Sequence, residues 1–434
     1  MNFGLEETLK YLPTEERESL LRSIEEDKVV HCCYLNQSKI SIEDFLKQYP
    51  NVKAHPFVKG AFIYSKEEYD LGKSILHSAG GIYIQDPSSM MPVYFLNPKK
   101  GDRIIDLCAA PGGKTIDAAL ALQGSGLVVS NDISYPRAKE LSSNIERLGL
   151  GNVIVSSVPP ASLSEAYPHS FDKVILDAPC SGSAMFRKNS LAKEDWTLEK
   201  VNSCAALQLK LLEEAYILVR KGGAIAYSTC SFSYEENEGV VKAFLAKHPD
   251  IKPRRLIDHP SFYKSESCPE GIHFFPSRFE GEGQFLIIFD KDGEEEVPSH
   301  NERKSNPEVK KHLDFLKNWN LEDRYTCLRG DTLYSLPCYF DCGKLSVLRY
   351  GVALLNVKDK AGVPEFALSH YLPSSISIPL NKEQAKKYLI GEAFPLNGKD
   401  GFQVVSYNAL NLGFVKIVKG MAKNHFPKGL RHRY

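Results

Sequence analysis

Residues 106–115 read DLCAAPGGKT, and this stretch decides the fold of the 434-residue chain. An apolar segment over 103–107 leads into it, and an amphipathic segment over 115–122 follows. A strand that passes through a glycine turn into a helix is typical of a parallel α/β sheet. Adjacent Gly112 and Gly113 let the backbone approach a ligand closely, and the helix start offers free N–H groups. The turn therefore predicts a binding site for a polar or anionic group.

Three ligands compete for such a turn, and the spacing separates them. A P-loop reads G-x-x-x-x-G-K-[ST], which requires glycine where this chain has Cys108. The dinucleotide pattern G-x-G-x-x-G is absent as well. S-adenosylmethionine remains, and we expect it as the cofactor.

Asp132 ends the second predicted strand, in VSND at 129–132. In an open parallel sheet the carboxyl ends of the strands line the ligand crevice, where a carboxylate can accept hydrogen bonds from both ribose hydroxyl groups. The alternative is a helix cap, because Pro136 suits the first turn of a helix that begins here. The glycine turn upstream favours the cofactor role.

Short apolar runs alternate with longer amphipathic segments from Ser78 to Asp290. This alternation predicts a doubly wound, mostly parallel sheet with helices on both faces. The predicted strands cover 103–107, 127–131, 152–156, 173–176, 224–228 and 284–289. The predicted helices cover 115–122, 136–148, 205–219 and 235–247.

Two cysteines follow the fourth and fifth of these strands. Cys180 stands in DAPCSG at 177–182, and Cys230 stands in STCS at 228–231. A lone cysteine after a strand is usually a small packed residue. If the two strands are neighbours, however, their ends lie about 5 Å apart. Both sulfur atoms can then reach one reacting atom.

Two adjacent thiols suit the methylation of a carbon atom. C5 of cytosine is a poor nucleophile, but a thiolate that adds to C6 makes C5 able to attack a methyl group. A second thiol can assist the later release of the first. Asp177 is placed to hydrogen-bond the pyrimidine and act as the catalytic acid. Lys114 either favours thiolate over thiol or pairs with a carboxylate.

Three segments, in order, resemble the RNA cytosine-C5 methyltransferases of the Nop/Sun group, and more closely the bacterial RsmF-type enzymes. They are DLCAAPGGKT at 106–115, DAPCSGSAMFRK at 177–188 and STCSFSYEENEGVV at 228–241. The ending at 419–434, KGMAKNHFPKGLRHRY, is similar to the RsmF-type tail. The resemblance implies a class I S-adenosylmethionine-dependent methyltransferase fold with a seven-stranded sheet.

The resemblance also implies roles for individual residues. Cys230 would be the nucleophile, and Cys180 would act in product release. The implied cofactor contacts are Cys108, Ala109, Ala110, Pro111, Gly112, Gly113, Lys114, Asp132 and Asp177.

Other enzymes compete with this interpretation. DNA cytosine-C5 methyltransferases attack with the Pro-Cys thiol of the fourth strand, which here would be Cys180. The second thiol, in Thr229-Cys230-Ser231, favours the RNA-type arrangement. An adenine amino-methyltransferase would place two prolines and an aromatic residue after Asp177. A cysteine hydrolase has weak support, because no histidine stands beside either thiol in a recognisable pattern.

The composition sets the class of protein. Hydrophobic residues make up 43% and charged residues 25%, as in ordinary soluble globular proteins. No apolar run approaches the roughly 18–20 residues that span a bilayer, and the N-terminus lacks a signal-peptide pattern. We therefore expect a cytoplasmic protein with no membrane partner. The ten cysteines have no disulfide or zinc-like spacing, so we expect reduced thiols and no metal.

Shifts in composition divide the chain into four predicted parts. They are an N-terminal α/β appendage over 1–77, a methyltransferase domain over 78–290, a charged linker over 291–311 and a mostly β, PUA-like module over 312–434. In the last part the predicted strands cover 328–331, 345–352, 402–405 and 413–418. The resemblance implies that the first and last parts bind RNA.

Lys plus Arg and Asp plus Glu both number 54, so the formal net charge is zero. A surface that binds nucleic acid must therefore be a local basic patch. Arg187 and Lys188 follow the Cys180 loop and are candidates to hold flanking phosphates; the alternative is a solvated loop charge. The tail over 414–434 has no acidic residue and interleaves aromatic with basic side chains. Its candidate RNA contacts are Lys423, Lys428 and Arg431.

We expect a monomer that methylates cytosine C5 in structured RNA, either 16S ribosomal RNA or the small ribosomal subunit. Two alternatives stay open. One is a tRNA substrate, and the other is a catalytically silent RNA-binding factor in ribosome assembly.

Overall fold

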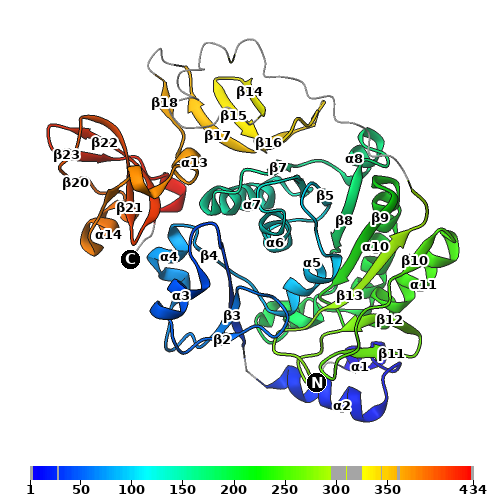
Figure 1. The fold of residues 1–434 in the computed structure, drawn as a ribbon. Helices are drawn as coiled ribbons and strands as arrows, with labels where there is room; N and C mark the ends of the chain where they lie inside the picture. Colours follow the sequence, from blue (N-terminus) through cyan, green and yellow to red (C-terminus); the bar gives the residue numbers. More distant parts are fainter. Residues whose placement is uncertain are drawn as a thin grey trace.

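The computed structural model describes residues 3–26, 29–294, 309, 325–343, 345–358 and 362–431. Figure 1 shows a central α/β domain, with the N-terminal helices below it and the C-terminal strands above and to the left. Most of the predicted linker over 291–311 lies outside the described residues.

Within the part of the chain that the structure describes, the central sheet has ten strands. Its main path runs β11-β12-β13-β9-β8-β5-β6-β7-β16, and β10 pairs with β13. Seven of its strands form the expected class I sheet: β5 (Arg103–Asp106), β6 (Leu127–Asn131), β7 (Val153–Ser156), β8 (Phe171–Asp177), β9 (Val219–Thr229), β12 (Cys268–His273) and β13 (Phe285–Lys291). The strands from β5 to β9 pair in parallel, and β13 runs antiparallel beside β9. The doubly wound prediction is confirmed.

The other three strands extend the sheet at its edges. They are β10 (Ile251–Pro253), β11 (Tyr263–Ser265) and β16 (Val347–Tyr350). β16 comes from the C-terminal part of the chain and pairs antiparallel with β7. The prediction of one strand over 345–352 is wrong, because Gly351, with φ of +66°, separates β16 from β17 (Val352–Asn356). The strand predicted over 328–331 is instead the end of β14 and the turn into β15.

Helices cover both faces of the central sheet, as the alternation of side chains along each strand requires. Ile104 packs with α5 (Met91–Leu96), α6 (Gly113–Ala121) and α7 (Tyr135–Leu148) on one face. Ile105, the next residue, packs on the other face with α8 (Pro160–Ala166), α10 (Leu198–Leu218) and α11 (Glu238–Lys247). The four predicted helices are all present.

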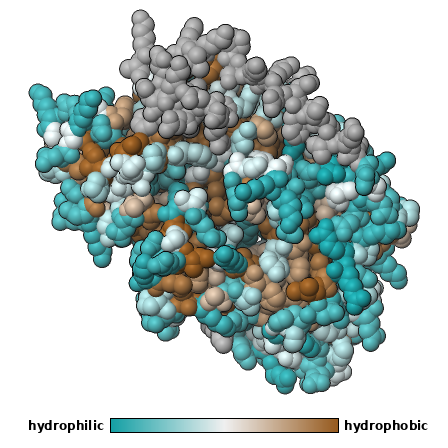
Figure 2. All heavy atoms as spheres, in the orientation of Figure 1, coloured by the Kyte–Doolittle hydropathy of each residue, from teal (hydrophilic) through white to brown (hydrophobic). Residues whose placement is uncertain are grey.

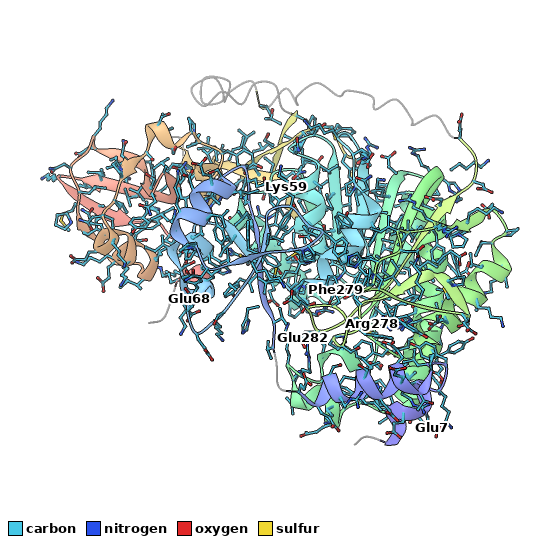
Figure 3. All side chains as sticks on the ribbon, turned by 60° about the horizontal axis from the view of Figure 1, so that its bottom comes forward. Glu7, Lys59, Glu68, Arg278, Phe279 and Glu282 are labelled. Carbon is cyan, nitrogen blue, oxygen red and sulfur yellow. The ribbon has the colours of Figure 1, made fainter. Side chains whose placement is uncertain are left out.

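The N-terminal part consists of two helices that pack on the central domain and a separate small sheet. Helices α1 (Phe3–Thr8) and α2 (Thr14–Glu25) pack on the central domain, where Leu9 contacts a cluster that includes Phe232 and Phe275. Arg278, labelled in Figure 3, lies on the loop between β12 and β13. It forms an ion pair with Glu16 of α2. A four-stranded sheet follows, in the order β2-β3-β1-β4, with helices α3 and α4. These elements are β1 (His31–Leu35), α3 (Ile42–Gln48), β2 (Lys53–Ala54), β3 (Ala61–Tyr64), α4 (Ile75–Ser78) and β4 (Ile82–Ile84).

The C-terminal part forms two further sheets. One has four strands: β14 (Tyr325–Arg329), β15 (Thr332–Leu336), β17 and β18 (Val363–Pro364). The other has five: β19 (Ile378–Pro379), β20 (Phe394–Pro395), β21 (Gly401–Tyr407), β22 (Leu410–Val418) and β23 (Met421–Asn424). Helices α13 (Phe366–Ser369) and α14 (Lys382–Ile390) pack with them.

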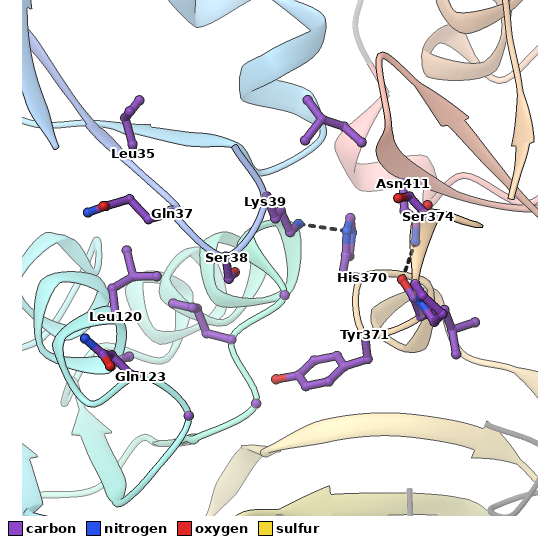
Figure 4. Close-up of a pocket in the computed structure, with 18 of the residues that line it drawn as sticks. Leu35, Gln37, Ser38, Lys39, Leu120, Gln123, His370, Tyr371, Ser374 and Asn411 are labelled. Carbon is purple, nitrogen blue, oxygen red and sulfur yellow. Dashed lines mark hydrogen bonds between the residues drawn. The ribbon is translucent and has the colours of Figure 1, made fainter. Parts of the chain in front are cut away.

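The N-terminal sheet, the central domain and the C-terminal part meet around a pocket of about 880 Å³ (Figure 4). At its wall, Lys39 Nζ donates to the backbone oxygen of Ala79 at 2.8 Å and lies 2.9 Å from His370 Nδ1. Phe45 and Leu389 share one apolar cluster across the same junction. Contacts between these distant segments therefore connect the N-terminal part of the chain to its C-terminal part.

Figure 2 shows hydrophilic residues over most of the visible rim, with hydrophobic residues gathered toward the middle of this face. In the described part of the chain, no helix is both long and apolar enough to cross a bilayer.

Candidate active site

A cavity of about 280 Å³ lies at the carboxyl ends of β5, β8 and β9. In the sheet, β6 and β7 follow β5 on one side, and β8 and β9 lie on its other side. The strand order therefore reverses at the β5–β8 pair, and open α/β sheets bind ligands at such a switch point. Six residues of the predicted turn line the cavity: Cys108, Ala109, Ala110, Pro111, Gly113 and Lys114. Asp177, Cys230 and Gln284 lie on its other walls.

Gly112 does not line the cavity, but it determines the backbone conformation of the turn. Its φ of +118° lies in the left-handed region, and a Cβ atom there would come within 2.8 Å of Leu141 Cδ1. Helix α6 therefore begins at Gly113, and Thr115 Oγ1 donates to Asp106 Oδ2 at 2.7 Å. These contacts fix the start of the helix against the end of β5.

Asp177 accepts three hydrogen bonds at the wall of the cavity. Its Oδ2 accepts a hydrogen bond from Lys114 Nζ at 2.7 Å. Its Oδ1 accepts from Ser228 Oγ at 2.7 Å and from Gln284 Nε2 at 2.8 Å. Burial lowers the pKa of Lys114, but Asp177 and the other nearby carboxylates outweigh burial, so the pKa is raised. Lys114 thus pairs with a carboxylate, the simpler of the two roles considered for it.

The two predicted thiols lie side by side. Residues Asp177 and Ser228 are partners at the ends of neighbouring parallel strands β8 and β9. The loops that follow bring Cys180 Sγ within 2.9 Å of Cys230 Sγ. The hydrogen bond with Cys230, and then burial, raise the pKa of Cys180 well above its usual value. Cys180 is therefore held in its protonated form, and Cys230 is the sulfur of the pair that lines the cavity.

The two carboxylates at the ends of β5 and β6 differ in access. Asp106 lines the cavity, its Oδ1 atom has no hydrogen-bond partner in the described chain, and burial raises its pKa to about 7. Asp132 is buried outside the lining. Its oxygens accept from the backbone N–H groups of Ala110 at 3.3 Å and Ser134 at 3.0 Å, and it pairs with Arg137. Asp106 is a candidate contact that the sequence interpretation did not assign, although its place at a strand end was a usable signal.

Arg187 and Lys188 have different surroundings. The Arg187 side chain is only 6% exposed, and its Nε donates to Glu282 Oε2 at 2.9 Å. Its Nη2 also donates to the backbone oxygen of Gly281 at 2.6 Å. In this position the guanidinium is buried and holds the β12–β13 loop, which does not suit the predicted contact with a phosphate. Lys188, 28% exposed, lines the cavity near Asp86.

One wall of the cavity comes from a segment without any recognised motif. Tyr83, Gln85 and Asp86 contribute to it from β4 and the turn that follows. Asp86 Oδ2 accepts from the backbone N–H of Glu282 at 3.0 Å, which joins this segment to the β12–β13 loop. A local sequence pattern cannot predict the contact between Asp86 and Glu282, because the two residues lie far apart in the chain.

The predicted basic residues of the tail lie far from this cavity, in the five-stranded sheet and after it. Lys423 is exposed on β23 directly opposite Lys416 of β22. Lys428 is exposed. Arg431 packs on Gly391 and donates to the backbone oxygen of Phe426, so its guanidinium is used within the module.

Comparison with known proteins agrees with this geometry. Residues 93–289 match the family model for the 16S rRNA methyltransferase RsmB/F, and residues 375–432 match the model for the methyltransferase RsmF PUA domain. The ribosomal RNA small subunit methyltransferase F of Shewanella sp. (strain MR-4) is 30% identical over 91% of this chain and 90% of its own length. The protein of the same name from Vibrio cholerae serotype O1 (strain M66-2) is also 30% identical, over 91% and 90%.

This chain belongs to the ribosomal RNA small subunit methyltransferase F family. A solved methyltransferase homolog from Pyrococcus horikoshii is 28% identical, with a TM-score of 0.57 over 67% of this chain and 99% of that one. As a family member the chain is an S-adenosylmethionine-dependent RNA methyltransferase. The C-terminal five-stranded sheet is its PUA domain.

The cavity fits this cofactor. The unpartnered Oδ1 of Asp106 needs a donor, and the cofactor carries hydroxyl and ammonium groups. The α6 start offers free backbone N–H groups to its carboxylate, and Gly113 leaves room beside Gln85. The groups that would hold S-adenosylmethionine are therefore Asp106, Asp177 and the six turn residues of the lining, Cys108, Ala109, Ala110, Pro111, Gly113 and Lys114.

Proposed function

We propose that this enzyme methylates C5 of cytosine in structured RNA, with 16S ribosomal RNA as its substrate. The supporting observation is the pair of sulfur atoms 2.9 Å apart beside the cavity of the glycine turn. The names of the relatives, ribosomal RNA small subunit methyltransferases, support the choice of RNA.

In the proposed reaction the thiolate of Cys230 forms a bond to C6 of cytosine, which makes C5 nucleophilic. When bound, S-adenosylmethionine supplies an electrophilic methyl group. Once C5 carries the methyl group, its proton passes to water, and the electron pair left at C5 forms the C5=C6 bond as the C6–S bond breaks. This elimination returns the Cys230 thiolate.

Cys180 and Asp177 are proposed to assist this sequence. Cys180 Sγ lies 2.9 Å from Cys230 Sγ and the pKa of Cys180 is raised, so as a thiol it can donate a hydrogen bond that stabilises Cys230 as the leaving thiolate. Asp177, held by Lys114, Ser228 and Gln284, is oriented to accept from the exocyclic amine of cytosine. The expected monomeric state and cytoplasmic location stay predictions.

Bisulfite mapping of cellular RNA tests the function and its alternatives. We expect a cytosine of 16S ribosomal RNA to be protected in cells that contain this protein and unprotected in cells that lack it. Restoring the gene with Cys230→Ala should leave that cytosine unprotected. A change confined to tRNA would support the tRNA alternative, and no change in any RNA would support a silent binding factor.

The PUA domain offers a surface for the RNA. Lys416 and Lys423 are exposed cross-strand partners, and like charges placed directly opposite each other destabilise a sheet unless an anion lies between them. Lys416 Nζ also lies 5.4 Å from the centre of the Phe402 ring. Two lysines beside an aromatic ring suit a phosphate and a stacked base.

Substitution of both lysines by glutamine should weaken RNA binding and flatten its dependence on salt. Loss of two phosphate contacts should reduce the slope of log K against log salt concentration by roughly 1.5. Fluorescence anisotropy over a salt series measures this slope. The matched control replaces Lys247 and Lys252, which are also exposed but pair with Glu213 and Asp292. An unchanged slope would exclude the surface.

A further inference from the structure

The buried carboxylate of Glu236 lies between the two loops that carry the thiols. Glu236 ends the 3₁₀ turn η4 (Tyr234–Glu236) and is 0% exposed. Its Oε1 accepts from the backbone N–H of Ser181 at 2.7 Å, and its Oε2 accepts from the hydroxyl groups of Ser181 and Ser231, both at 2.5 Å. Each serine directly follows one of the cysteines. One side chain thus joins the Cys180 loop to the Cys230 loop.

Neighbouring groups hold this carboxylate in place. Gln208 Nε2 of α10 donates to Glu236 Oε1 at 3.1 Å and to the backbone oxygen of Pro179 at 3.0 Å. Tyr227 OH donates to the backbone oxygen of Glu236 at 2.6 Å and to Gln208 Oε1 at 3.1 Å. The carboxylate is therefore fixed from the helix, the strand and both loops.

Such a site is costly unless all of its contacts form. A buried carboxylate must be satisfied by hydrogen bonds, and loss of one partner leaves the others unpaired. Burial raises the pKa of Glu236, while the hydrogen bonds from Ser181, Ser231 and Gln208 oppose that shift. The four donors all belong to the two cysteine loops and to α10, so the same contacts that satisfy the carboxylate also fix the positions of these loops.

We infer that Glu236 is a positioning residue, which sets the spacing of Cys180 and Cys230 by holding Ser181 and Ser231. The inference rests on the proposed function, because the spacing matters only if Cys230 attacks the pyrimidine and Cys180 assists its release. Glu236 itself does not line the cavity and is not expected to touch RNA or cofactor.

The test measures kcat, KM and the dissociation constant of S-adenosylmethionine for substituted enzymes. Glu236→Ala should lower kcat about 100-fold, the effect of misplacing reacting groups by about 1 Å. KM for RNA and cofactor affinity should not change, because neither binding surface includes Glu236. Glu236→Gln keeps the acceptor for the Ser181 N–H but loses the second oxygen, and should lower kcat about tenfold.

Glu238→Ala is the matched control. Glu238 is also a buried glutamate, two residues further on, but it accepts from Ser265 at 2.7 Å and lies 2.9 Å from His273, away from the thiols. Its substitution should lower the midpoint of thermal unfolding while kcat of the folded enzyme stays close to wild type. Equal losses of kcat in Glu236→Ala and Glu238→Ala would overturn the inference.

Two further outcomes are decisive. If Glu236→Ala does not fold, the glutamine variant decides, and wild-type kcat in that variant overturns the inference. Covalent trapping separates this failure from failure of the proposed function. A Cys180→Ala enzyme with Glu236 intact should form a protein–RNA adduct, and adding Glu236→Ala should slow its formation. No adduct with Glu236 intact would refute the thiol chemistry itself, whereas equal rates of adduct formation would refute only the role of Glu236.

Discussion

Replacement of Cys230 by alanine is expected to lower kcat for methyl transfer to RNA by about 10⁴-fold or more, the scale on which loss of a nucleophile acts. Without this thiolate, C5 of cytosine stays a poor nucleophile. Transfer of labelled methyl groups to RNA measures the rate. Affinity for S-adenosylmethionine, measured by calorimetry, should persist because Asp106, Asp177 and the glycine turn remain.

Cys204→Ala is the control for the loss of a thiol. Cys204 is a partly buried cysteine on α10 that does not line the cavity. Its substitution should leave methyl transfer near the wild-type rate. If the Cys230→Ala enzyme methylated RNA at undiminished speed, the covalent mechanism would be refuted.

Cys180→Ala is expected to have the opposite signature, in which the enzyme reacts but does not release its product. Cys230 can still add to C6, but the departing sulfur no longer receives a hydrogen bond from the neighbouring thiol. A covalent protein–RNA species should therefore accumulate and survive a denaturing gel. Its amount should approach one per enzyme, while repeated turnover stops.

The double variant Cys180→Ala/Cys230→Ala provides the control, and it should form no such species. A reciprocal result would reverse the roles of the two thiols. If Cys230→Ala accumulated the adduct and Cys180→Ala did not, Cys180 would be the attacking group, as in the DNA-type arrangement.

Much of the central domain could be predicted because its elements depend on near neighbours. Strand β6 has its predicted bounds, Leu127–Asn131, since a continuous apolar run between turns is enough to define a buried strand. The turn over 108–114 was found from glycine spacing, which controls backbone conformation directly. The proximity of Cys180 and Cys230 followed from one assumption about strand order, and the β8–β9 pairing meets it.

Predictions failed or were missing where a contact joins distant segments. The charge of Arg187 suggested a phosphate contact, but Glu282, on a loop far along the chain, buries it in an ion pair. A single strand over 345–352 became two because β16 pairs with β7 of the central sheet.

The amino-acid sequence did not predict β12, α5 or α8. It alone determined the type of six strands and four helices of the central domain, the place of the ligand turn and the residues able to do the chemistry. These properties depend on side-chain periodicity, backbone freedom at glycine and the reactivity of sulfur, all of which act over a few residues. Only the tertiary structure decided that Cys230 lines the cavity, that Glu236 joins the two thiol loops and that segment 83–86 forms a wall. Such contacts are made between buried polar groups that lie far apart in the sequence, so a local sequence pattern cannot predict them.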